Sequence, residues 1–409
     1  MVISLNNKKI VFLAEKVLSK YKLCDHCLGR LFASIERGIT NEDRGRKLRK
    51  NMVDYKNIKI KNCWLCLGLF DEIKNFADLI LDYLKEYDFD TFLVGSRIDE
   101  EILEREQELL EFYGQEYSEP IKMELNREIG KILEIKSNKK VDFEKPTIMV
   151  LIDTLYDVVN LQIKPIYIYG RYNKYKRDIP QTKWFCRICK GKGCKKCDYT
   201  GKMYKTSVEE LISKHILEKT RGDGESFHGS GREDIDVRML GNGRPFVIEI
   251  KNPKIRNLDL VCVEDEINTN NKGIIKVNNL HFSNKNEVVR IKSNDFKKQY
   301  RVVFIGEKAI NKEKLKKVVQ TLRGKKIRQF TPSRVASRRA NIVRDRNIYN
   351  LDIESIDINN ATLIIEAQSG TYIKELISGD DGRTIPNISE MIGFPCKVKE
   401  LDVINIKGE

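Results

Sequence analysis

Eight of the ten cysteines in this chain of 409 residues form four Cys-x-x-Cys pairs. At this spacing, two thiolates on one tight turn supply half of a tetrahedral zinc shell. Two pairs complete a shell that leaves no position for water, so we predict structural zinc, about two ions for the chain. The predicted ligands are Cys24, Cys27, Cys63 and Cys66 for one site, and Cys186, Cys189, Cys194 and Cys197 for the other.

The two predicted zinc sites differ in how compact they are. The second occupies residues 186–197, where glycines allow sharp turns and lysines favour ionised thiols. In the first, a long stretch separates the two pairs, but both pairs read Cys-x-x-Cys-Leu-Gly. His26 could replace a cysteine there, but we expect it to be a solvated loop histidine.

Carboxylates and arginines are concentrated in the segment Gly231-Arg-Glu-Asp-Ile-Asp-Val-Arg-Met-Leu-Gly-Asn-Gly-Arg-Pro245. An aspartate near arginine keeps a low pKa and stays ionised in a closed pocket, as a nucleophile requires. The flanking glycines would let a ligand approach the backbone. The alternative is a surface ion-pair lattice, which the charges alone favour.

Two stretches combine the residue types that bind nucleic acid. Residues 322–346, the arginine segment, hold nine Arg or Lys side chains against one Asp, and arginine suits bidentate phosphate contacts. Residues 171–177 interleave Arg, Lys and Tyr, which suits stacking on RNA bases, although a plain solvated linker is an equal alternative. The candidate RNA contacts are Arg328, Arg334, Arg338 and Arg339 in the first stretch, and Arg171 and Lys174 in the second.

A glycine-rich stretch, residues 222–231, fits neither the dinucleotide-binding spacing nor the P-loop. We therefore predict no nucleotide cofactor, neither ATP nor adenosylmethionine. This favours a reaction without a cofactor, or a binding protein.

The composition limits the class of protein. With 41% apolar and 33% charged residues the chain is globular, which excludes a disordered or collagen-like chain. No apolar run approaches the roughly 20 residues of a membrane helix, and the N-terminus lacks a signal peptide, so we expect a cytoplasmic protein without a membrane partner. The net charge of +15 favours a polyanionic partner, with a merely lysine-rich composition as the alternative.

The expected elements indicate an α+β fold with a mixed sheet. Helical patterns dominate residues 1–135, and another helix is expected over 207–219. The strict alternation of strand and helix that a doubly wound sheet requires is missing. The predicted strands are 147–153, 165–170, 246–250, 300–305 and 361–367.

These motifs together resemble one family. Gly231–Pro245, Lys298-Gln-Tyr-Arg301, residues 331–339 and Gly370-Thr-Tyr-Ile-Lys-Glu-Leu376 look like the archaeal and eukaryotic tRNA pseudouridine synthases that act on the TΨC arm, the "Pus ten" family. The resemblance implies three parts: a zinc-bearing helical segment at 1–70, a THUMP-like RNA-binding domain at 71–180, and a pseudouridine synthase catalytic domain at 181–409.

The resemblance also implies roles for single residues. The catalytic Asp of the superfamily follows an apolar residue and precedes a glycine by five positions, which matches Asp236, with Asp234 as the runner-up. Tyr300 would stack on the uracil. Lys374 would be the basic partner of the aspartate, and Ile373 and Leu401 would line the base pocket.

The function implied is the isomerisation of uridine to pseudouridine in the T-loop of tRNA, at uridine 55 and often uridine 54. The tRNA would be held by its T-arm and acceptor stem, and the reaction would need no cofactor. The base must leave its stack, so an aromatic ring and an apolar wall would replace the lost stacking. The alternative is a zinc-dependent tRNA-binding protein or chaperone without catalytic activity.

Overall fold

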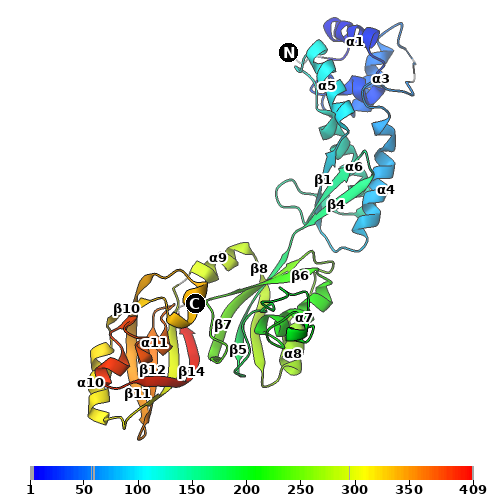
Figure 1. The fold of residues 1–409 in the computed structure, drawn as a ribbon. Helices are drawn as coiled ribbons and strands as arrows, with labels where there is room; N and C mark the ends of the chain where they lie inside the picture. Colours follow the sequence, from blue (N-terminus) through cyan, green and yellow to red (C-terminus); the bar gives the residue numbers. More distant parts are fainter. Residues whose placement is uncertain (1–3, 57, 59, 294, 408–409) are drawn as a thin grey trace. The chain divides into compact units, whose positions relative to one another are not determined.

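The chain folds into two compact units, residues 1–164 and 165–409, each of which is described by itself. The computed structural model describes residues 4–56, 58, 60–293 and 295–407, apart from the side chains of Ser337 and Arg338. Figure 1 shows helices and one small sheet in the first unit, and a large sheet in the second. In the described part, no helix has the length and apolar character needed to cross a bilayer.

The first unit combines helices with a four-stranded sheet in the order β2-β1-β3-β4. Strands β1, β2 and β3 run parallel, and β4 is antiparallel to β3. The helices are α1 (Lys8–Lys20), α2 (Asp25–Arg30), α3 (Asn41–Lys50), η1 (Leu69–Glu72), α4 (Ile73–Leu84), α5 (Glu100–Tyr113) and α6 (Ile121–Ser137). The strands are β1 (Thr91–Arg97), β2 (Lys140–Val141), β3 (Ile148–Asp153) and β4 (Val158–Ile163).

One core holds this unit together from the first cysteines to β4. The apolar stripe of α4 at positions 76, 77, 80 and 84 is buried, as the spacing of three and four residues requires. Cys27, Cys63 and Cys66 belong to the same core as the strands. The helical segment at 1–70 is therefore packed into the unit that contains the sheet.

The second unit is built on a mixed sheet in the order β13-β10-β11-β12-β9-β14-β7-β5-β8, with β6 paired to β7. The strands pair antiparallel except β14 and β7, which run parallel. The strands are β5 (Ile166–Lys174), β6 (Gly224–Gly229), β7 (Arg238–Lys251), β8 (Ile275–Ser283), β9 (Lys297–Gly306), β10 (Lys326–Phe330), β11 (Val343–Ile356), β12 (Asn360–Ala367), β13 (Thr384–Ile385) and β14 (Cys396–Lys407).

Helices cover this sheet and connect its strands. The expected helix at 207–219 is α7, which begins after Ser207, whose hydroxyl accepts a hydrogen bond from the amide of Glu210 as an N-cap. The helices are η2 (Lys195–Cys197), α7 (Val208–Thr220), α8 (Leu260–Asn270), α9 (Lys285–Ser293), α10 (Lys312–Leu322), η3 (Ser333–Arg338), α11 (Ile373–Ser378) and α12 (Ile388–Ile392).

The predicted fold class, α+β with a mixed sheet, is confirmed, and each of the five predicted strands overlaps an observed one. The chain divides at 164/165, so residues 165–180, which we assigned to the THUMP-like part, belong to the second unit. Residues 171–174 are the end of β5, which pairs with β7 and β8. The interpretation of 171–177 as a linker was therefore wrong for these four residues.

Candidate functional site

A cavity of about 220 Å³ opens in the second unit where the loop before β7, strand β9, strand β14 and helix α11 meet. Its walls combine charged, aromatic and apolar side chains. The residues that line it include Gly231, Glu233, Asp234, Arg244, Lys298, Tyr300, Arg334, Arg339, Ile373, Lys374 and Leu401.

Lys374, at the start of α11, lies between two carboxylates of the loop before β7. Its Nζ donates to Oδ1 and Oδ2 of Asp236 at 2.9 and 2.8 Å and lies 3.4 Å from Oδ2 of Asp234. Burial on its own would raise the pKa of Asp236, but the hydrogen bond and charge of Lys374 outweigh it and hold that pKa below its ordinary value. The pairing of an aspartate with Lys374 that the sequence predicted is therefore present.

The two carboxylates differ in where they face. The side chain of Asp234 is 37% exposed and lines the cavity that also contains Tyr300. The side chain of Asp236 is 59% exposed and is not among the described residues that line this cavity. It faces a neighbouring groove instead.

Arg334, from the arginine segment, reaches Asp234 from η3. Its Nη1 lies 2.9 Å from Oδ2 of Asp234, and its Nε donates to Glu375 at 2.7 Å. Glu375 is buried in α11 beside Lys374, so this arginine is fixed in orientation by two carboxylates. Two cations therefore keep Asp234 in an electropositive setting.

Tyr300 lies in β9 between β12 and β14, in register with Ile365 and Val403. Its side chain is buried but borders the cavity. Burial raises the pKa of Tyr300 to about 12, so the phenol is neutral near pH 7. Ile373 and Leu401, both buried, supply apolar wall on the same cavity.

A buried polar network supports the loop that carries the carboxylates. The fully buried side chain of Glu233 pairs with Arg244 at 2.8 Å and accepts from the hydroxyl of Tyr172 at 2.9 Å. Lys174 Nζ donates to the backbone carbonyls of Ile179, Asp234 and Ile235 at 2.8, 3.2 and 3.1 Å. These contacts fix the backbone on both sides of Asp234.

Two of the predicted RNA contacts are corrected by this arrangement. Lys174 is fully buried and holds backbone carbonyls, so it is not available to a phosphate. Arg171 is also buried and donates to the carbonyls of Asn242 and Gly243 at 2.7 and 3.0 Å. Both residues lie on β5, a strand with neighbours on both sides, in which every residue from 168 to 174 is buried, so both faces of the strand are covered here.

The other predicted contacts remain on the surface as far as they are described. Arg328 is 68% exposed on β10, and Arg339 lines the cavity and donates to the hydroxyl of Tyr372 at 3.1 Å. The side chain of Arg338 lies outside the described part of the chain.

Arg177 and Asp402 are positioning residues that the sequence did not reveal. Arg177 donates to the backbone carbonyls of Asp236 and Leu401 at 2.7 and 2.9 Å. Asp402, buried in β14, accepts from Arg177 and from Arg238 of β7 at 2.8 and 2.9 Å. These contacts attach the loop that carries Asp234 and Asp236 to strands β14 and β7 where the two strands pair. The hydrogen bond between Arg238 and Asp402 joins residues more than 160 positions apart in sequence.

The eight predicted metal ligands form two tetrads, as expected. Within each tetrad the four sulfur atoms all lie within 4.8 Å of one another. The Sγ–Sγ distances of 3.7 Å for Cys24 and Cys66 and 3.8 Å for Cys189 and Cys197 match a tetrahedron with metal–sulfur bonds of about 2.3 Å. Each tetrad therefore fits a tetrahedral ion such as zinc.

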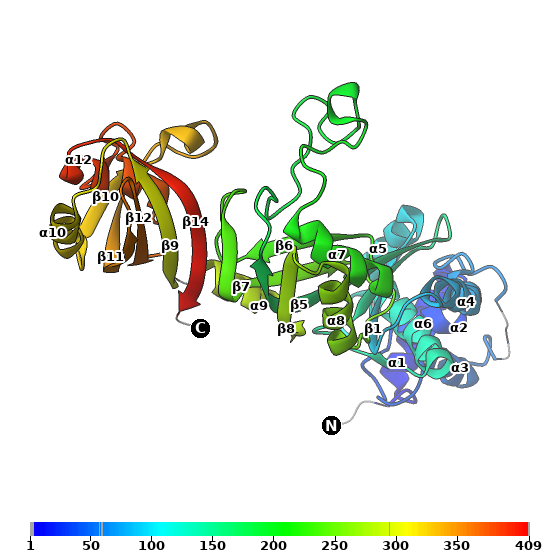
Figure 2. The same ribbon diagram turned by 90° about the horizontal axis from the view of Figure 1, so that it is seen from below.

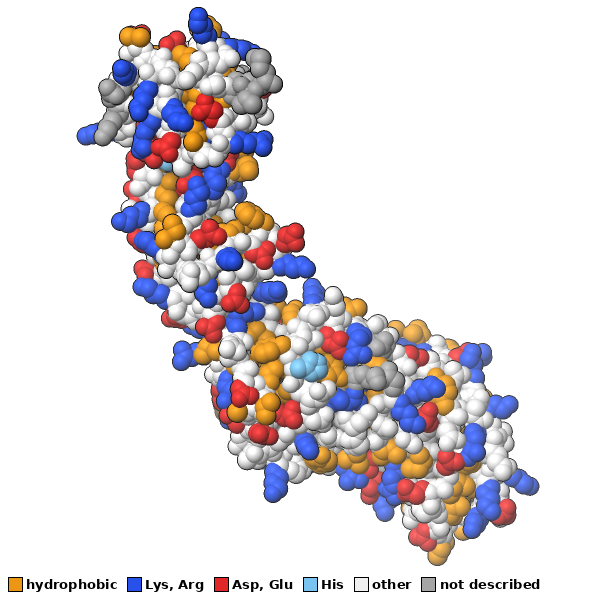
Figure 3. All heavy atoms as spheres, turned by 180° about the vertical axis from the view of Figure 1, so that it is seen from behind, with side chains coloured by type: hydrophobic (Ala, Val, Ile, Leu, Met, Phe, Trp, Pro, Cys, Tyr) orange, Lys and Arg blue, Asp and Glu red, His pale blue; other side chains and the backbone are white. Residues whose placement is uncertain are grey.

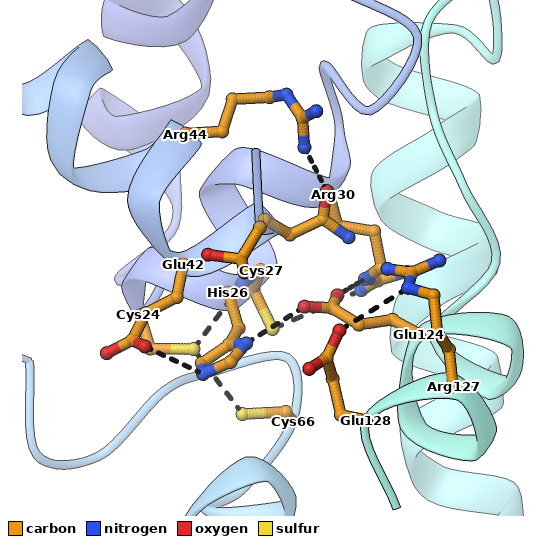
Figure 4. A network of polar contacts seen from close by, with 12 residues as sticks. Cys24, His26, Cys27, Arg30, Glu42, Arg44, Cys66, Glu124, Arg127 and Glu128 are labelled. Atoms are coloured by element: carbon orange, nitrogen blue, oxygen red, sulfur yellow. Dashed lines mark hydrogen bonds and ion pairs between the residues drawn. The ribbon is translucent and has the colours of Figure 1, made fainter. Parts of the chain in front are cut away.

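His26, which we expected to be a solvated loop residue, lies in α2 and faces the interior. Its Nδ1 lies 2.8 Å from Glu124 of α6, a side chain with no exposed surface (Figure 4). Arg30, 1% exposed, lies between this carboxylate at 3.6 Å and the sulfur of Cys27 at 4.0 Å. The first tetrad is therefore joined to α6 by a buried charged network.

The net positive charge is not gathered in one continuous patch on the face shown in Figure 3. There, Lys and Arg side chains are interspersed with acidic ones. Basic side chains around the cavity, and not the total charge of the chain, therefore indicate where RNA could contact the second unit.

The chain is similar to one family of known proteins over nearly its whole length. The family described as "Pus10, C-terminal" matches residues 167–407, and "Pus10 THUMP domain, archaeal" matches residues 76–153. Proteins named tRNA pseudouridine synthase Pus10 from Methanothrix thermoacetophila and Methanocaldococcus jannaschii are 38% and 41% identical to the chain. The alignments cover 98% and 99% of this chain and 95% and 96% of those proteins.

Solved structures with partial similarity include a Cbf5-Nop10-Gar1 complex and a pseudouridylate synthase. The first is 15% identical with a TM-score of 0.32, over 49% of this chain and 45% of that chain. The second is 11% identical with a TM-score of 0.22, over 60% of this chain and 66% of that chain.

The mixed sheet, the cavity lined by Asp234, Tyr300 and Lys374, the THUMP match and the named relatives define the class, an α+β enzyme that carries a THUMP domain. The chain belongs to the Pus10 family, because the C-terminal family match spans more than half of it and the relatives align over nearly its whole length.

Proposed function

We propose that the protein isomerises uridine to pseudouridine in the T-loop of tRNA, at position 55 and also at position 54. The observation that carries this proposal is one cavity that brings together the carboxylate of Asp234, the ammonium group of Lys374 and the buried ring of Tyr300. The relatives named tRNA pseudouridine synthase support tRNA as the substrate.

Asp234 is the carboxylate that the geometry favours for the reaction, in place of Asp236, which we had ranked first. Asp234 lines the cavity with Tyr300, whereas Asp236 faces the neighbouring groove and accepts two hydrogen bonds from Lys374. In this assignment Asp236 holds the lysine in place, and Lys374 and Arg334 place two positive charges beside Asp234, at 3.4 and 2.9 Å.

The chemistry requires that the N-glycosidic bond breaks, that the uracil turns, and that its C5 then bonds to the sugar. An ionised carboxylate can attack the sugar or the base, or remove a proton from the sugar. The uracil would stack on Tyr300 against Ile373 and Leu401, which replaces the stacking that the nucleotide gives up when it leaves the RNA. None of these steps needs a nucleotide cofactor.

RNA phosphates would be held by exposed arginines at the rim of the site, including Arg328 and Arg339. The THUMP-bearing unit would bind the rest of the tRNA, with the T-arm and acceptor stem as its targets. Both cysteine tetrads would bind zinc in a structural role, since four thiolates leave no open position for substrate. Reduced thiols of this kind suit a cytoplasmic enzyme.

The decisive experiment maps pseudouridines in an unmodified tRNA transcript after incubation with the protein. We expect pseudouridine at positions 55 and 54. Transcripts with cytidine at either position should lose only the corresponding product. A transcript that stays unmodified at both positions, although it binds, would show a tRNA-binding protein without this activity.

A further inference from the structure

The segment between β5 and α7 extends from the catalytic sheet and carries the second cysteine tetrad (Figure 2). We name residues 183–205 the knuckle arm. Its base is a short hairpin in which the amide of Cys186 donates to the carbonyl of Gly201 at 2.7 Å and the amide of Met203 to that of Trp184 at 2.9 Å. The hairpin and the tetrad together hold the arm in one arrangement.

The arm is strongly cationic. It contains eight Lys or Arg residues and one Asp, a formal charge of +7, and a zinc ion with four thiolates would leave +5. Lys183 and Lys202 pair with acids of the catalytic unit at 3.6 and 2.7 Å. The tip cations are exposed and have no carboxylate within ion-pair distance in the described part of the chain: Arg187, Lys190, Lys192, Lys195 and Lys196.

Large apolar side chains are exposed on the same arm. Phe185 is 60% exposed and Tyr199 is 70% exposed, and Ile188 is exposed to a similar degree. Aromatic rings beside lysines are the combination that stacks on unpaired bases while binding the adjacent phosphates. The positive charge favours RNA over a protein partner as the occupant.

The base of the arm forms one wall of a groove of about 440 Å³ next to the catalytic cavity. Trp184 and Tyr204 line it from the arm, with their rings edge to face at 5.6 Å. Arg334 and Arg339 of the arginine segment also line it, together with both aspartates of the site and Lys374. An RNA strand that enters the cavity would therefore pass beside the arm.

We propose that the knuckle arm binds the RNA strand that flanks the target uridine, with its lysines on phosphates and its exposed rings on unpaired bases. This proposal rests on the proposed function. It gives the second tetrad a task, because the metal would fix the surface that meets the substrate.

The test is tRNA binding by a variant in which Lys190, Lys192, Lys195 and Lys196 are all replaced by Gln. We expect the Kd for an unmodified transcript to rise about tenfold or more, and the slope of log K against log salt to fall by about 0.7 for each phosphate of an unpaired strand that the variant no longer neutralises. The kcat at saturating tRNA should change less than twofold, because the cavity is intact.

A matched control replaces four exposed lysines around α10, Lys308, Lys312, Lys316 and Lys317, and should bind as the wild type does. An unchanged zinc content shows that the arm variant is folded. Wild-type affinity and salt slope in the arm variant would overturn the proposal. A wild-type protein that binds tRNA but forms no pseudouridine would refute the proposed function alone.

A second inference concerns Lys298, a buried lysine on the cavity that the mechanism above does not use. It lies two residues before Tyr300 on β9, is 5% exposed, and borders the cavity. Its Nζ points toward Gly231, where a Cβ would approach it to 2.6 Å. In the described part of the chain this nitrogen makes no hydrogen bond or ion pair.

The charges around Lys298 come from three places. Arg244 of β7 and Glu233 of the loop before it are buried beside it, and Asp295 precedes β9. Burial, helped by the charge of Arg244, lowers the pKa of Lys298 to about 7, although Glu233 and Asp295 oppose the change. Neutral amine is therefore present at physiological pH.

We propose that Lys298 is the catalytic residue that accepts the proton from C5 of the uracil. Once the bond between C1′ and C5 has formed, the C5–H bond breaks and its electron pair restores the C5–C6 double bond. The proton passes to the lone pair of Nζ and then to water. The isomerisation as a whole moves one hydrogen from C5 to N1, so no further reactant is needed. This step also rests on the proposed function.

The test compares Lys298→Met with the wild type on two tRNA transcripts, one with uridine and one with 5-fluorouridine at the target position. The fluorinated ring has no hydrogen at C5, so its bond rearrangement does not depend on this proton transfer. We expect a loss of about a hundredfold or more with uridine, and an isotope effect from deuterium at C5 that the wild type lacks.

Conversion of 5-fluorouridine by Lys298→Met should stay within a few-fold of the wild type. If both substrates slow equally and no isotope effect emerges, Lys298 acts only in shaping the cavity and the proposal fails. A wild-type enzyme that converts neither substrate would instead refute the proposed function.

Discussion

The ammonium group of Lys374 donates to both carboxylate oxygens of Asp236, at 2.8 and 2.9 Å. The same nitrogen lies 3.4 Å from Asp234, the carboxylate that borders the cavity. One lysine therefore serves two aspartates that are separated by a single residue. The sequence motif makes the two carboxylates nearly equivalent, but in the structure they differ in their contact with Lys374 and in whether they border the cavity.

The division of roles predicts different outcomes for two matched substitutions. Asp234→Asn should lower pseudouridine formation at least a thousandfold while tRNA affinity stays within a few-fold, because the reacting group is removed from an intact cavity. Asp236→Asn should lower the rate more moderately, since Lys374 loses its main partner. Tritium release from C5-labelled uridine in tRNA measures both rates. The reverse order would restore Asp236 as the reacting group.

The depressed pKa of Asp236 gives a pH dependence. The pair with Lys374 stabilises the fold fully above the ordinary carboxyl pKa of about 3.9, and this contribution disappears as the pH falls through the lowered pKa. In Lys374→Met the pKa of Asp236 should rise from its lowered value, because burial is then opposed only by a backbone hydrogen bond and the charge of Arg334. Carboxyl carbon NMR titration measures it. Lys399→Met, which changes an exposed lysine of β14, should leave this pKa unchanged.

The buried network behind the first tetrad predicts a large loss of stability in the first unit. Arg30→Met removes the buried guanidinium from Glu106 and from Glu124, which keeps only His26 as a basic partner among the described residues, and should cost about 3–5 kcal/mol in the free energy of unfolding. Arg46→Met removes the ion pairs of a half-exposed arginine with Asp25, Glu42 and Asp43 and should cost less than about 1 kcal/mol. Denaturant unfolding of both variants and of Arg30→Met/Glu124→Gln tests this. The double variant should recover part of the loss, and equal costs for the two single variants would contradict the prediction.

Metal removal should affect the two tetrads unequally. Cys27, Cys63 and Cys66 belong to the core of the first unit, whereas Cys189, Cys194 and Cys197 are partly exposed on the knuckle arm. Cys66→Ser and Cys194→Ser should each lower the zinc content from about two ions to about one. Only Cys66→Ser should lower the melting temperature of the first unit strongly. Thermal unfolding measures this temperature, and elemental analysis of each folded variant measures its zinc content. Zinc absent from the wild type would contradict both expectations.

The parts of the fold that depend on local pattern could be predicted from the sequence. Strands β9 and β12 contain the β-branched runs at 300–305 and 361–367, and the cysteine pairs place two ligands on one turn regardless of the rest of the chain. The resemblance also extended to the motif of Lys374, whose ammonium group contacts Asp236 and Asp234; its catalytic role stays a prediction.

The parts that depend on distant contacts could not be predicted. Arg171 and Lys174 are as basic as any RNA-binding pair, and only the place of β5 between β7 and β8 shows that they are buried. The salt bridges of Asp402 with Arg238 and of Glu124 with Arg30 join residues far apart in sequence. The direction in which Asp234 and Asp236 point is likewise set by the buried network beneath their loop, which spacing does not encode.

Strand β14 lies between β9 and β7 in the sheet, although it follows both in the chain. Asp234 precedes β7 and Tyr300 lies on β9, so the two sides of the cavity are bridged by a strand that the ribosome makes after every other described strand. A nascent chain that lacks β14 therefore contains Asp234 and Tyr300 but not the strand that joins the two sides of the cavity. The cavity can form only after this last described strand has been made and has entered the sheet.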